Sequence, residues 1–548
     1  MYLGRSLYFI GVLLLFCNGE PELNLQQGVV KGYMKTSYKG RNFVAFEGIP
    51  YAEPPIGELR FAPPKPAGKW EGVLEANKQY TCAQLIPIPF LWGPSGTEDC
   101  LYVYVYVPGE NIDANANLPV VVHIHGGAFM LGSPKMMAQP EYIMDQDVVY
   151  VTLNYRLGIL GFLSTEDGVV PGNMGLKDQS LALKWIKENI KNFGGNPDSI
   201  TITGLSAGGA SVHYHYLSPM SEGLFSRGFS QSGTALQSWA LTKNPLEKAM
   251  FVARNVSCET DSTEKMIACM RSKSHKDLII GIDGLFVLIS AMPSTPFGPV
   301  VEKGGDSPFI ADHPYKILKD GKVYDVPWIN TNVADEGIFP VGFFIHLKKI
   351  DFIAENWETI MPSALDMNDT VDDSLKSEVV GKIKQFYYKD QPVSEDNIEN
   401  MVKIYSDRLF FVDSELATRT HSSAVKSPVF VYFYRYLPQD NLRFRKMKPG
   451  VSHGLDGKLI FKWMINADLK PKDEKMMKLL TKFLKDFAET GVPKIGEVDW
   501  DPVEPGSEEM KYLEVNSVED VQMKTRTVLG EKEFWNSLPI QENNHIYK

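Results

Sequence analysis

Four nearly continuous apolar runs are the clearest pattern in the chain. They cover residues 118–125, 148–155, 200–204 and 429–436. Strands without polar alternation are typical of a sheet that is buried on both faces. The runs therefore predict a largely parallel sheet between two layers of helices.

Helical patterns lie between these runs. One covers residues 179–193, with apolar residues at steps of three and four, and ends at Gly194. Another begins at Asp473 and ends before Gly491 and Pro493. Strands that alternate with helices predict the α/β class. Residues from about 340 to 420 read as a charged, helical layer of the same body. Since no Pro/Gly/Ser-rich linker divides the chain, we expect one domain over residues 20–548.

The N-terminus predicts export from the cell. Residues 1–19 combine Arg5, a short apolar run and a small-residue exit, which is typical of a cleaved signal peptide; a buried N-terminal helix is the alternative. This run is shorter than the ~20 residues that span a bilayer, and no later segment is apolar enough, so we expect a secreted protein without a membrane span. The sequons at Asn255 and Asn368 fit a glycoprotein.

Four cysteines remain after cleavage at about residue 19, and they allow three pairings. Proximity in sequence favours Cys82–Cys100 and Cys258–Cys269.

Charge and motif content exclude several classes of partner. The chain has 56 basic and 67 acidic residues, a net charge of −11, which argues against nucleic-acid binding. It has no zinc-spaced His/Cys cluster, phosphate-binding loop or dinucleotide fingerprint, so we expect neither a metal nor a cofactor.

The strongest chemical signal is Gly204-Leu205-Ser206-Ala207-Gly208, which follows a β-branched strand and precedes a helix-compatible segment. A sharp strand-to-helix turn exposes a serine hydroxyl as a nucleophile, and glycines at its flanks avoid collisions. Gly126 and Gly127, directly after the first apolar run, are able to turn two N–H groups toward one point. With the Ala207 N–H they would stabilise an oxyanion. A plain structural turn is the alternative at both places.

A nucleophilic serine needs a base and an orienting acid. Among ten histidines, His453 lies in a glycine-containing loop shortly after a predicted strand. Glu336 follows another strand, over residues 326–330, and the order serine, acid, histidine is that of hydrolases with this serine motif. Spacing alone leaves other choices open.

Several further blocks carry a family resemblance. They are residues 46–55, 59–61, 98–101, 154–158, 171–179, 193–197 and 231–233. With the serine and glycine motifs, they resemble the type-B carboxylesterase/lipase family, the cholinesterase-like branch of the α/β-hydrolases, and insect carboxylesterases most of all. The likeness runs from about residue 25 to 540.

The resemblance implies an α/β-hydrolase fold and a site. It gives Ser206 as nucleophile, Glu336 as acid and His453 as base, with Gly126, Gly127 and Ala207 as oxyanion donors. It implies the same two disulfides and a supporting Ser232. It also implies two structural ion pairs, Arg60–Glu98 and Arg156–Asp178.

Two positions bear on the substrate. Leu205 stands where the family commonly has a glutamate, and Phe297 resembles an acyl-pocket phenylalanine, although core packing is the alternative there. A site without that carboxylate favours neutral, lipophilic esters over choline esters. The sequence thus predicts a secreted serine carboxylesterase. The alternatives are an esterase specific for juvenile hormone or a pheromone and a non-catalytic adhesion protein of the same fold.

Overall fold

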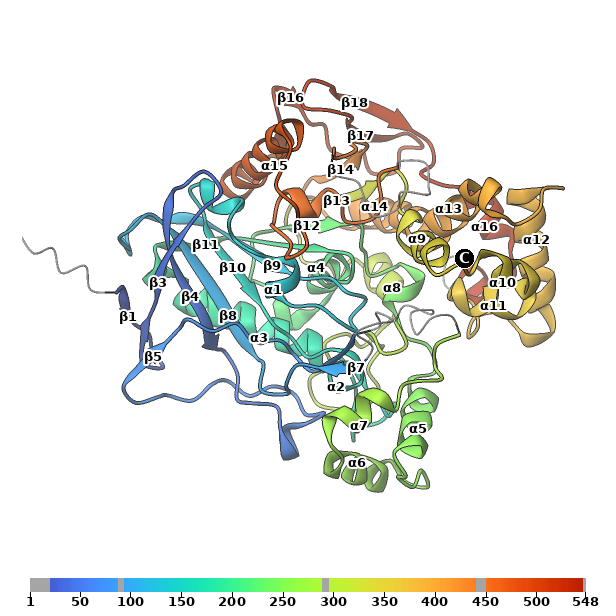
Figure 1. Cartoon of the computed structure of the whole chain (residues 1–548), viewed down its shortest axis with the longest axis horizontal. Coiled ribbons are helices and arrows are strands. Elements are labelled where there is room, and N and C mark those ends of the chain that lie inside the picture. Colours follow the sequence, from blue (N-terminus) through green and yellow to red (C-terminus); the bar gives the residue numbers. More distant parts are fainter. Residues whose placement is uncertain (1–19, 87–92, 288–294, 440–449, 546–548) are drawn as a thin grey trace, which may run out of the picture.

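A computed structural model describes residues 20–86, 93–287, 295–439 and 450–545 (Figure 1). The predicted signal peptide, residues 1–19, falls outside these ranges.

Within the described residues, eleven strands form the central sheet in the order β18-β17-β14-β13-β12-β11-β9-β10-β8-β4-β3. The seven strands from β17 to β10 in this order are mutually parallel, while β18 and the β8-β4-β3 edge are antiparallel. Their bounds are β3 Tyr33–Thr36, β4 Asn42–Pro50, β8 Tyr102–Pro108, β9 Leu118–Ile124, β10 Val149–Leu153, β11 Gly195–Leu205, β12 Arg227–Gln231, β13 Trp328–Val333, β14 Val429–Tyr434, β17 Met510–Val515 and β18 Val521–Arg526. The predicted mostly parallel sheet is confirmed.

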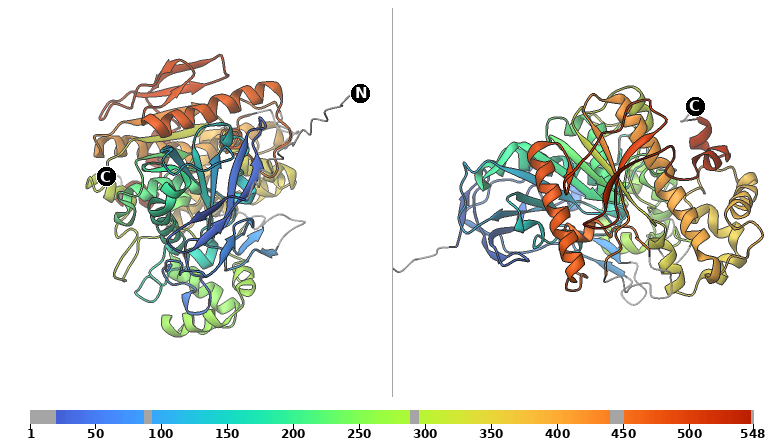
Figure 2. Two further views of the ribbon diagram at one scale, coloured as in Figure 1. Left: turned by 90° about the vertical axis from the view of Figure 1, so that its left-hand side faces the viewer. Right: turned by 90° about the horizontal axis from the view of Figure 1, so that it is seen from above.

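Helices cover both faces of the sheet because neighbouring strand residues point to opposite sides. Val120 and Val122 of β9 pack in the core that includes α3 (Met174–Asn189) and α4 (Ala207–Leu217). Val121, between them, packs in the core that includes α15 (Pro471–Thr490). Figure 2 shows α15, in orange, lying across one face of the sheet.

The predicted element boundaries differ in detail from the observed ones. α3 starts at Met174, and a separate 3₁₀ turn, Ile190–Phe193, follows it directly and ends at left-handed Gly194. β11 starts at Gly195, five residues before the predicted strand. Residues 196–199, Asn-Pro-Asp-Ser, lie at a shift in the register between β11 and β9. Because none of them is a typical strand residue, the hydrophobic pattern did not indicate this part of the strand.

Residues 338–424 are mainly helical, as predicted, and gather on the right-hand side of Figure 1. The helices are α9 Ile338–His346, α10 Ile350–Glu355, α11 Trp357–Ala364, α12 Lys376–Tyr388, α13 Ile398–Ser406 and α14 Val412–Ala424. A π-helical turn, Asp407–Phe411, joins α13 to α14. Such turns are frequent at functional sites.

The remaining elements surround this framework. The helices are α1 Pro134–Met137, α2 Gly158–Phe162, α5 Pro245–Asn255, α6 Thr263–Ser272, α7 His275–Ile280, α8 Pro314–Lys319, α16 Lys532–Ser537 and α17 Gln541–His545. The strands are β1 Glu22–Asn24, β2 Val29–Lys31, β5 Val73–Glu75, β6 Gln84–Ile86, β7 Gly93–Ser95, β15 Lys494–Ile495 and β16 Val498–Asp499.

Both predicted disulfides are present. Cys82 and Cys100 are joined with their Cα atoms 5.0 Å apart, and Cys258 and Cys269 with theirs 5.8 Å apart. Asn255 and Asn368 are both exposed; their glycosylation stays a prediction. In the described part of the chain, no helix has the length and apolar character needed to cross a membrane.

Candidate active site

Five neighbouring parallel strands bring the predicted site residues to one edge of the sheet. The chain passes from β9 to β10 on one side and then to β11 on the other side of β9, so the strand order reverses there. Ligands of open α/β sheets bind at the carboxyl ends of the strands at such a reversal. The residues that follow these strand ends are Gly126 and Gly127 after β9, Ser206 after β11, Ser232 after β12, Glu336 after β13 and His453 after β14.

Ser206 lies on a strained turn between β11 and α4. Its backbone has φ 60° and ψ −123°, a conformation that costs a non-glycine residue about 1–3 kcal/mol. A methyl group on Gly204 would lie 2.3 Å from backbone atoms of Gly208, and one on Gly208 would lie 2.1 Å from the carbonyl oxygen of Ile124. The flanking glycines are therefore required by close backbone contact. The turn is held because the Ser206 N–H donates to the Gln231 carbonyl (2.7 Å).

Three backbone N–H groups near Ser206 have no acceptor among the described residues. They belong to Gly126, Gly127 and Ala207. Gly126 adjoins the serine, since a methyl group on it would lie 3.2 Å from Ser206 Cβ. Ala207 begins α4, so its N–H lies at the positive end of that helix. Unpaired donors beside a serine are suited to binding an oxyanion.

Glu336 is fully buried and accepts three hydrogen bonds. His453 Nδ1 lies 2.6 Å from Oε2. The Ser232 hydroxyl (2.5 Å) and the Val333 N–H (2.9 Å) both donate to Oε1. Because all three groups approach as donors, the carboxylate holds the imidazole in the tautomer that carries its proton on Nδ1.

The His453 side chain is 7% exposed and packs against two aromatic rings. Its ring centre lies 4.8 Å from that of Phe410 and 5.6 Å from that of Phe339. Its hydrogen bond to Glu336 leaves Nε2 for a substrate or nucleophile. Across the described ranges, no hydrogen bond joins Ser206 to His453. Hydrogen bonds of this kind are often long before substrate binds.

Leu205 links the serine turn to the histidine loop. Its side chain is 4% exposed, and a methyl group on Gly454, next to His453, would lie 3.3 Å from Leu205 Cδ2. Phe297 is also buried, at 1% exposure. The neighbouring Gly298 donates its N–H to Thr242. The site thus has apolar neighbours and no carboxylate at position 205.

Three further residues at this site, Gln231, Asp456 and Phe410, had no role predicted from the sequence. Gln231 accepts the Ser206 N–H through its carbonyl, and its amide donates to Asp456 Oδ2 (2.8 Å). Asp456 is fully buried, and burial raises the pKa of its carboxyl group. Its place three residues after His453 was an available signal. Phe410 comes from the π-helical turn, which no sequence pattern announced.

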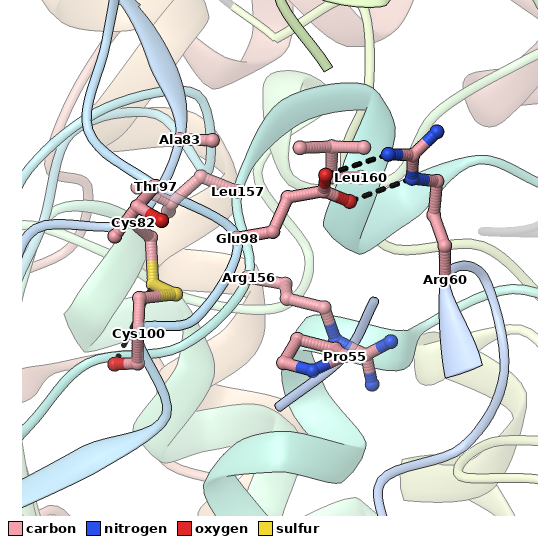
Figure 3. Close-up of a pocket in the computed structure, with 10 residues that line it drawn as sticks. All are labelled: Pro55, Arg60, Cys82, Ala83, Thr97, Glu98, Cys100, Arg156, Leu157 and Leu160. Carbon is pink, nitrogen blue, oxygen red and sulfur yellow. Dashed lines mark hydrogen bonds and ion pairs between the residues drawn. A yellow bond between two sulfur atoms is a disulfide. The ribbon is translucent and has the colours of Figure 1, made fainter. Parts of the chain in front are cut away.

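A separate pocket lies beside the Cys82–Cys100 disulfide (Figure 3). Arg60 forms two hydrogen bonds of 2.6 Å with Glu98 there. Arg156, which also lines the pocket, binds Asp178 at 2.8 and 2.7 Å. Both predicted ion pairs are confirmed, and neither includes a residue of the predicted triad. Within the described ranges, no group of three or more His, Cys, Asp or Glu residues is placed to hold a metal ion.

Comparison with known proteins gives consistent matches over almost the whole chain. Residues 19–535 match the model described as "Carboxylesterase family". The chain is 42% identical to venom carboxylesterase-6 of Apis mellifera, with 95% of each chain covered. It is 34% identical to the juvenile hormone esterase of Tribolium castaneum, with 86% of this chain and 84% of that one covered. A crystal structure of juvenile hormone esterase from Manduca sexta, with OTFP covalently attached, is similar at 25% identity and a TM-score of 0.83; the match covers 96% of this chain and 100% of that one.

Proposed function

Because this chain belongs to the carboxylesterase family and is a carboxylic ester hydrolase, we propose that it cleaves neutral, lipophilic esters through an acyl-enzyme intermediate on Ser206. The observation that carries this proposal is the shared position of three features at one sheet edge. They are the strained serine turn, the unpaired N–H groups and the His453–Glu336 pair.

In the proposed first step, Ser206 Oγ attacks the ester carbonyl carbon while His453 Nε2 takes the hydroxyl proton. The carbonyl oxygen becomes an oxyanion and accepts hydrogen bonds from the N–H groups of Gly126, Gly127 and Ala207. When the tetrahedral intermediate collapses, the alkoxide leaves with the proton from His453. Water then attacks the acyl-serine with His453 again as base, which releases the acid and restores Ser206.

Glu336 serves this cycle through charge and orientation. Each time His453 takes a proton, an imidazolium forms 2.6 Å from the buried carboxylate. The opposite charge stabilises that cation, and the two other donors to Glu336 keep the carboxylate in place. Ser232 is therefore assigned a supporting role.

The proposed substrate class follows from the surroundings of Ser206. Leu205, next to Ser206, is buried and apolar, and Phe339 and Phe410 pack against His453. Phe297 is buried too, and its place in the acyl pocket is part of the proposal. A cationic alcohol group would find no carboxylate at position 205. The relative named juvenile hormone esterase supports a juvenile-hormone ester as the second candidate, and a pheromone ester is the other alternative substrate. A comparison of kcat/KM across juvenile hormone, acetate pheromones, choline esters and aryl esters distinguishes these substrates.

Secretion and a single domain are part of the same proposal. Two disulfides fit an oxidising compartment, and Asn255 and Asn368 are exposed and so open to a glycan. Expression in insect cells should release a protein in the medium that begins near residue 20 and loses mass on treatment with an N-glycosidase. An intracellular protein that retains residue 1 would contradict this.

Ser206→Ala tests the central step. The folded variant should hydrolyse a 4-nitrophenyl ester at least about 10⁴-fold more slowly than the wild type, because the nucleophile is lost. Wild-type turnover by the variant would remove the serine mechanism. A folded wild-type protein without any esterase activity would favour the adhesion-protein alternative.

A further inference from the structure

The imidazole of His125 makes an unusual contact with its own chain. Its Nδ1 lies 2.8 Å from the carbonyl oxygen of the next residue, Gly126. Because a carbonyl only accepts, Nδ1 must carry the proton in this hydrogen bond. His125 is 1% exposed, and burial lowers the pKa of its imidazole to about 4, so the ring is neutral near pH 7.

This hydrogen bond acts on the peptide between Gly126 and Gly127. The peptide unit is planar and trans, so its C=O and N–H point in opposite directions. The group that fixes the Gly126 carbonyl therefore also sets the direction of the Gly127 N–H, which is one of the three donors without an acceptor among the described residues.

The same peptide is free to rotate unless something holds it. Glycine adopts positive and negative φ with similar ease, so a peptide between two glycines flips at low steric cost. The next carbonyl, that of Gly127, is fixed by the N–H groups of Met130 (2.9 Å) and Leu131 (3.0 Å). For the Gly126 carbonyl, His125 is the one hydrogen-bond donor in the described part of the chain.

The surroundings of His125 keep the ring in this position. It stacks on Tyr155 with ring centres 4.6 Å apart, and the Tyr155 hydroxyl donates to the His125 carbonyl (3.0 Å). A methyl group on Gly132 would lie 2.5 Å from both His125 Nδ1 and the Gly126 oxygen. A side chain at position 132 would therefore break the hydrogen bond between His125 and Gly126, and glycine avoids this. The other ring nitrogen, Nε2, is buried without a hydrogen-bond partner among the described residues. The hydrogen bond from Nδ1 to the Gly126 carbonyl is therefore the one that the ring makes.

We propose that His125 is a positioning residue for the oxyanion site: its Nδ1–H locks the Gly126–Gly127 peptide with the Gly127 N–H facing the oxyanion. This inference rests on the proposed function, since it assumes that the N–H groups bind the oxyanion of an ester intermediate. It adds to that function a side chain that touches neither substrate nor Ser206.

The test compares His125→Phe with His123→Phe. Both remove a buried imidazole and keep an aromatic ring, but His123 packs at a tilt against Phe461 and makes no hydrogen bond to the Gly126 carbonyl. Loss of one oxyanion donor costs about 10²–10³ in kcat, so a donor that is misdirected part of the time should cost about 10–100-fold. We expect that loss in kcat for His125→Phe, with KM within about threefold of the wild type. For His123→Phe, both parameters should stay within about threefold.

Two inhibitors separate this role from general destabilisation. A trifluoromethyl ketone forms a tetrahedral adduct with an oxyanion, whereas the matching methyl ketone binds largely without one. His125→Phe should weaken the first by the factor lost in kcat/KM and leave the second unchanged. If His125→Phe does not fold, His125→Gln and His125→Met form the pair to compare, because Gln retains an N–H donor and Met does not. Equal activity in that pair would overturn the inference.

The outcomes also separate this inference from the proposed function. If the wild type is active and depends on Ser206, but His125→Phe matches His123→Phe in kcat and in both inhibitor affinities, only the role of His125 is refuted. If the wild type has no esterase activity, or Ser206→Ala retains it, the proposed function fails and this inference fails with it.

Discussion

Glu336→Gln is the substitution that tests the site geometry most sharply, because the structure fixes how the new amide must lie. Two donors, the Ser232 hydroxyl and the Val333 N–H, both point at Oε1. The amide oxygen of the glutamine must stay there to accept them. Its NH₂ group then takes the place of Oε2, opposite His453 Nδ1.

Two N–H donors would then face each other at a separation close to 2.6 Å, the present distance between Oε2 and Nδ1. His453 escapes this clash by carrying its proton on Nε2, the nitrogen that must accept the Ser206 proton. An equivalent loss of the correct tautomer in a serine hydrolase triad lowers kcat by about 10⁴. We expect the same magnitude, which is about 5.5 kcal/mol of transition-state stabilisation.

The assay is steady-state hydrolysis of a 4-nitrophenyl ester, with thermal unfolding measured in parallel. Asp413→Asn is the matched control. Asp413 is also a buried carboxyl, but burial raises its pKa to about 7, so it is only partly charged near neutral pH. It accepts a hydrogen bond from the Ser238 N–H and not from His453. A Glu336→Gln protein within tenfold of wild-type kcat would refute the assigned tautomer and with it the role of Glu336.

Three further predictions concern stability and the serine turn. In the wild type the Lys177 amine lies 2.7 Å from the buried Glu302 carboxylate, and Lys177→Met leaves that carboxylate without its cation. The free energy of unfolding, measured in urea, should therefore fall by about 3–5 kcal/mol. A fall below about 1 kcal/mol would contradict a desolvated ion pair. Burial lowers the pKa of His421 from 6.5 to about 3. Between these two pH values the unfolded chain binds a proton that the folded chain does not, so stability falls as the pH falls below about 6.5. His421→Gln should make that fall shallower by about 1.4 kcal/mol per pH unit, and an unchanged slope in urea titrations at pH 6 and 4 would exclude this contribution. Gly208→Ala should abolish ester hydrolysis because its methyl group would lie 2.1 Å from a backbone oxygen of β9. Gly68→Ala is the control, since a methyl group there meets open space and activity should be retained. Equal activity of the two variants would show that the serine turn tolerates displacement.

The apolar runs predicted the sheet because a strand that is buried on both faces consists almost entirely of apolar residues. The residues at 118–125 and 429–436 became β9 and β14, with small differences at their ends. The first half of β11 was not predicted, since residues 196–199 are Asn-Pro-Asp-Ser and lie at a shift in its register. The disulfides and the Arg60–Glu98 and Arg156–Asp178 pairs were also predicted correctly.

The candidate site was predicted in its parts but not in its contacts. Motif and order pointed to Ser206, Glu336 and His453, because each motif lies in a short segment of the chain. The Phe410 ring against His453 and the Asp456–Gln231 hydrogen bond join residues that are distant in sequence. Contacts of that kind depend on how the segments after β13 and β14 pack against the strand ends, and no local sequence pattern encodes that packing. The roles of the triad and of the oxyanion donors stay predictions.

Covalent labelling tests the central claim most directly. An organophosphate such as paraoxon phosphorylates a serine that an adjacent base has activated, and it leaves ordinary surface serines unmodified. Treatment of the purified protein followed by peptide mass spectrometry should place one diethylphosphoryl group on Ser206, with activity lost in proportion to labelling. Ester hydrolysis that persists without label on Ser206, or inactivation with the label on another residue, would contradict the account.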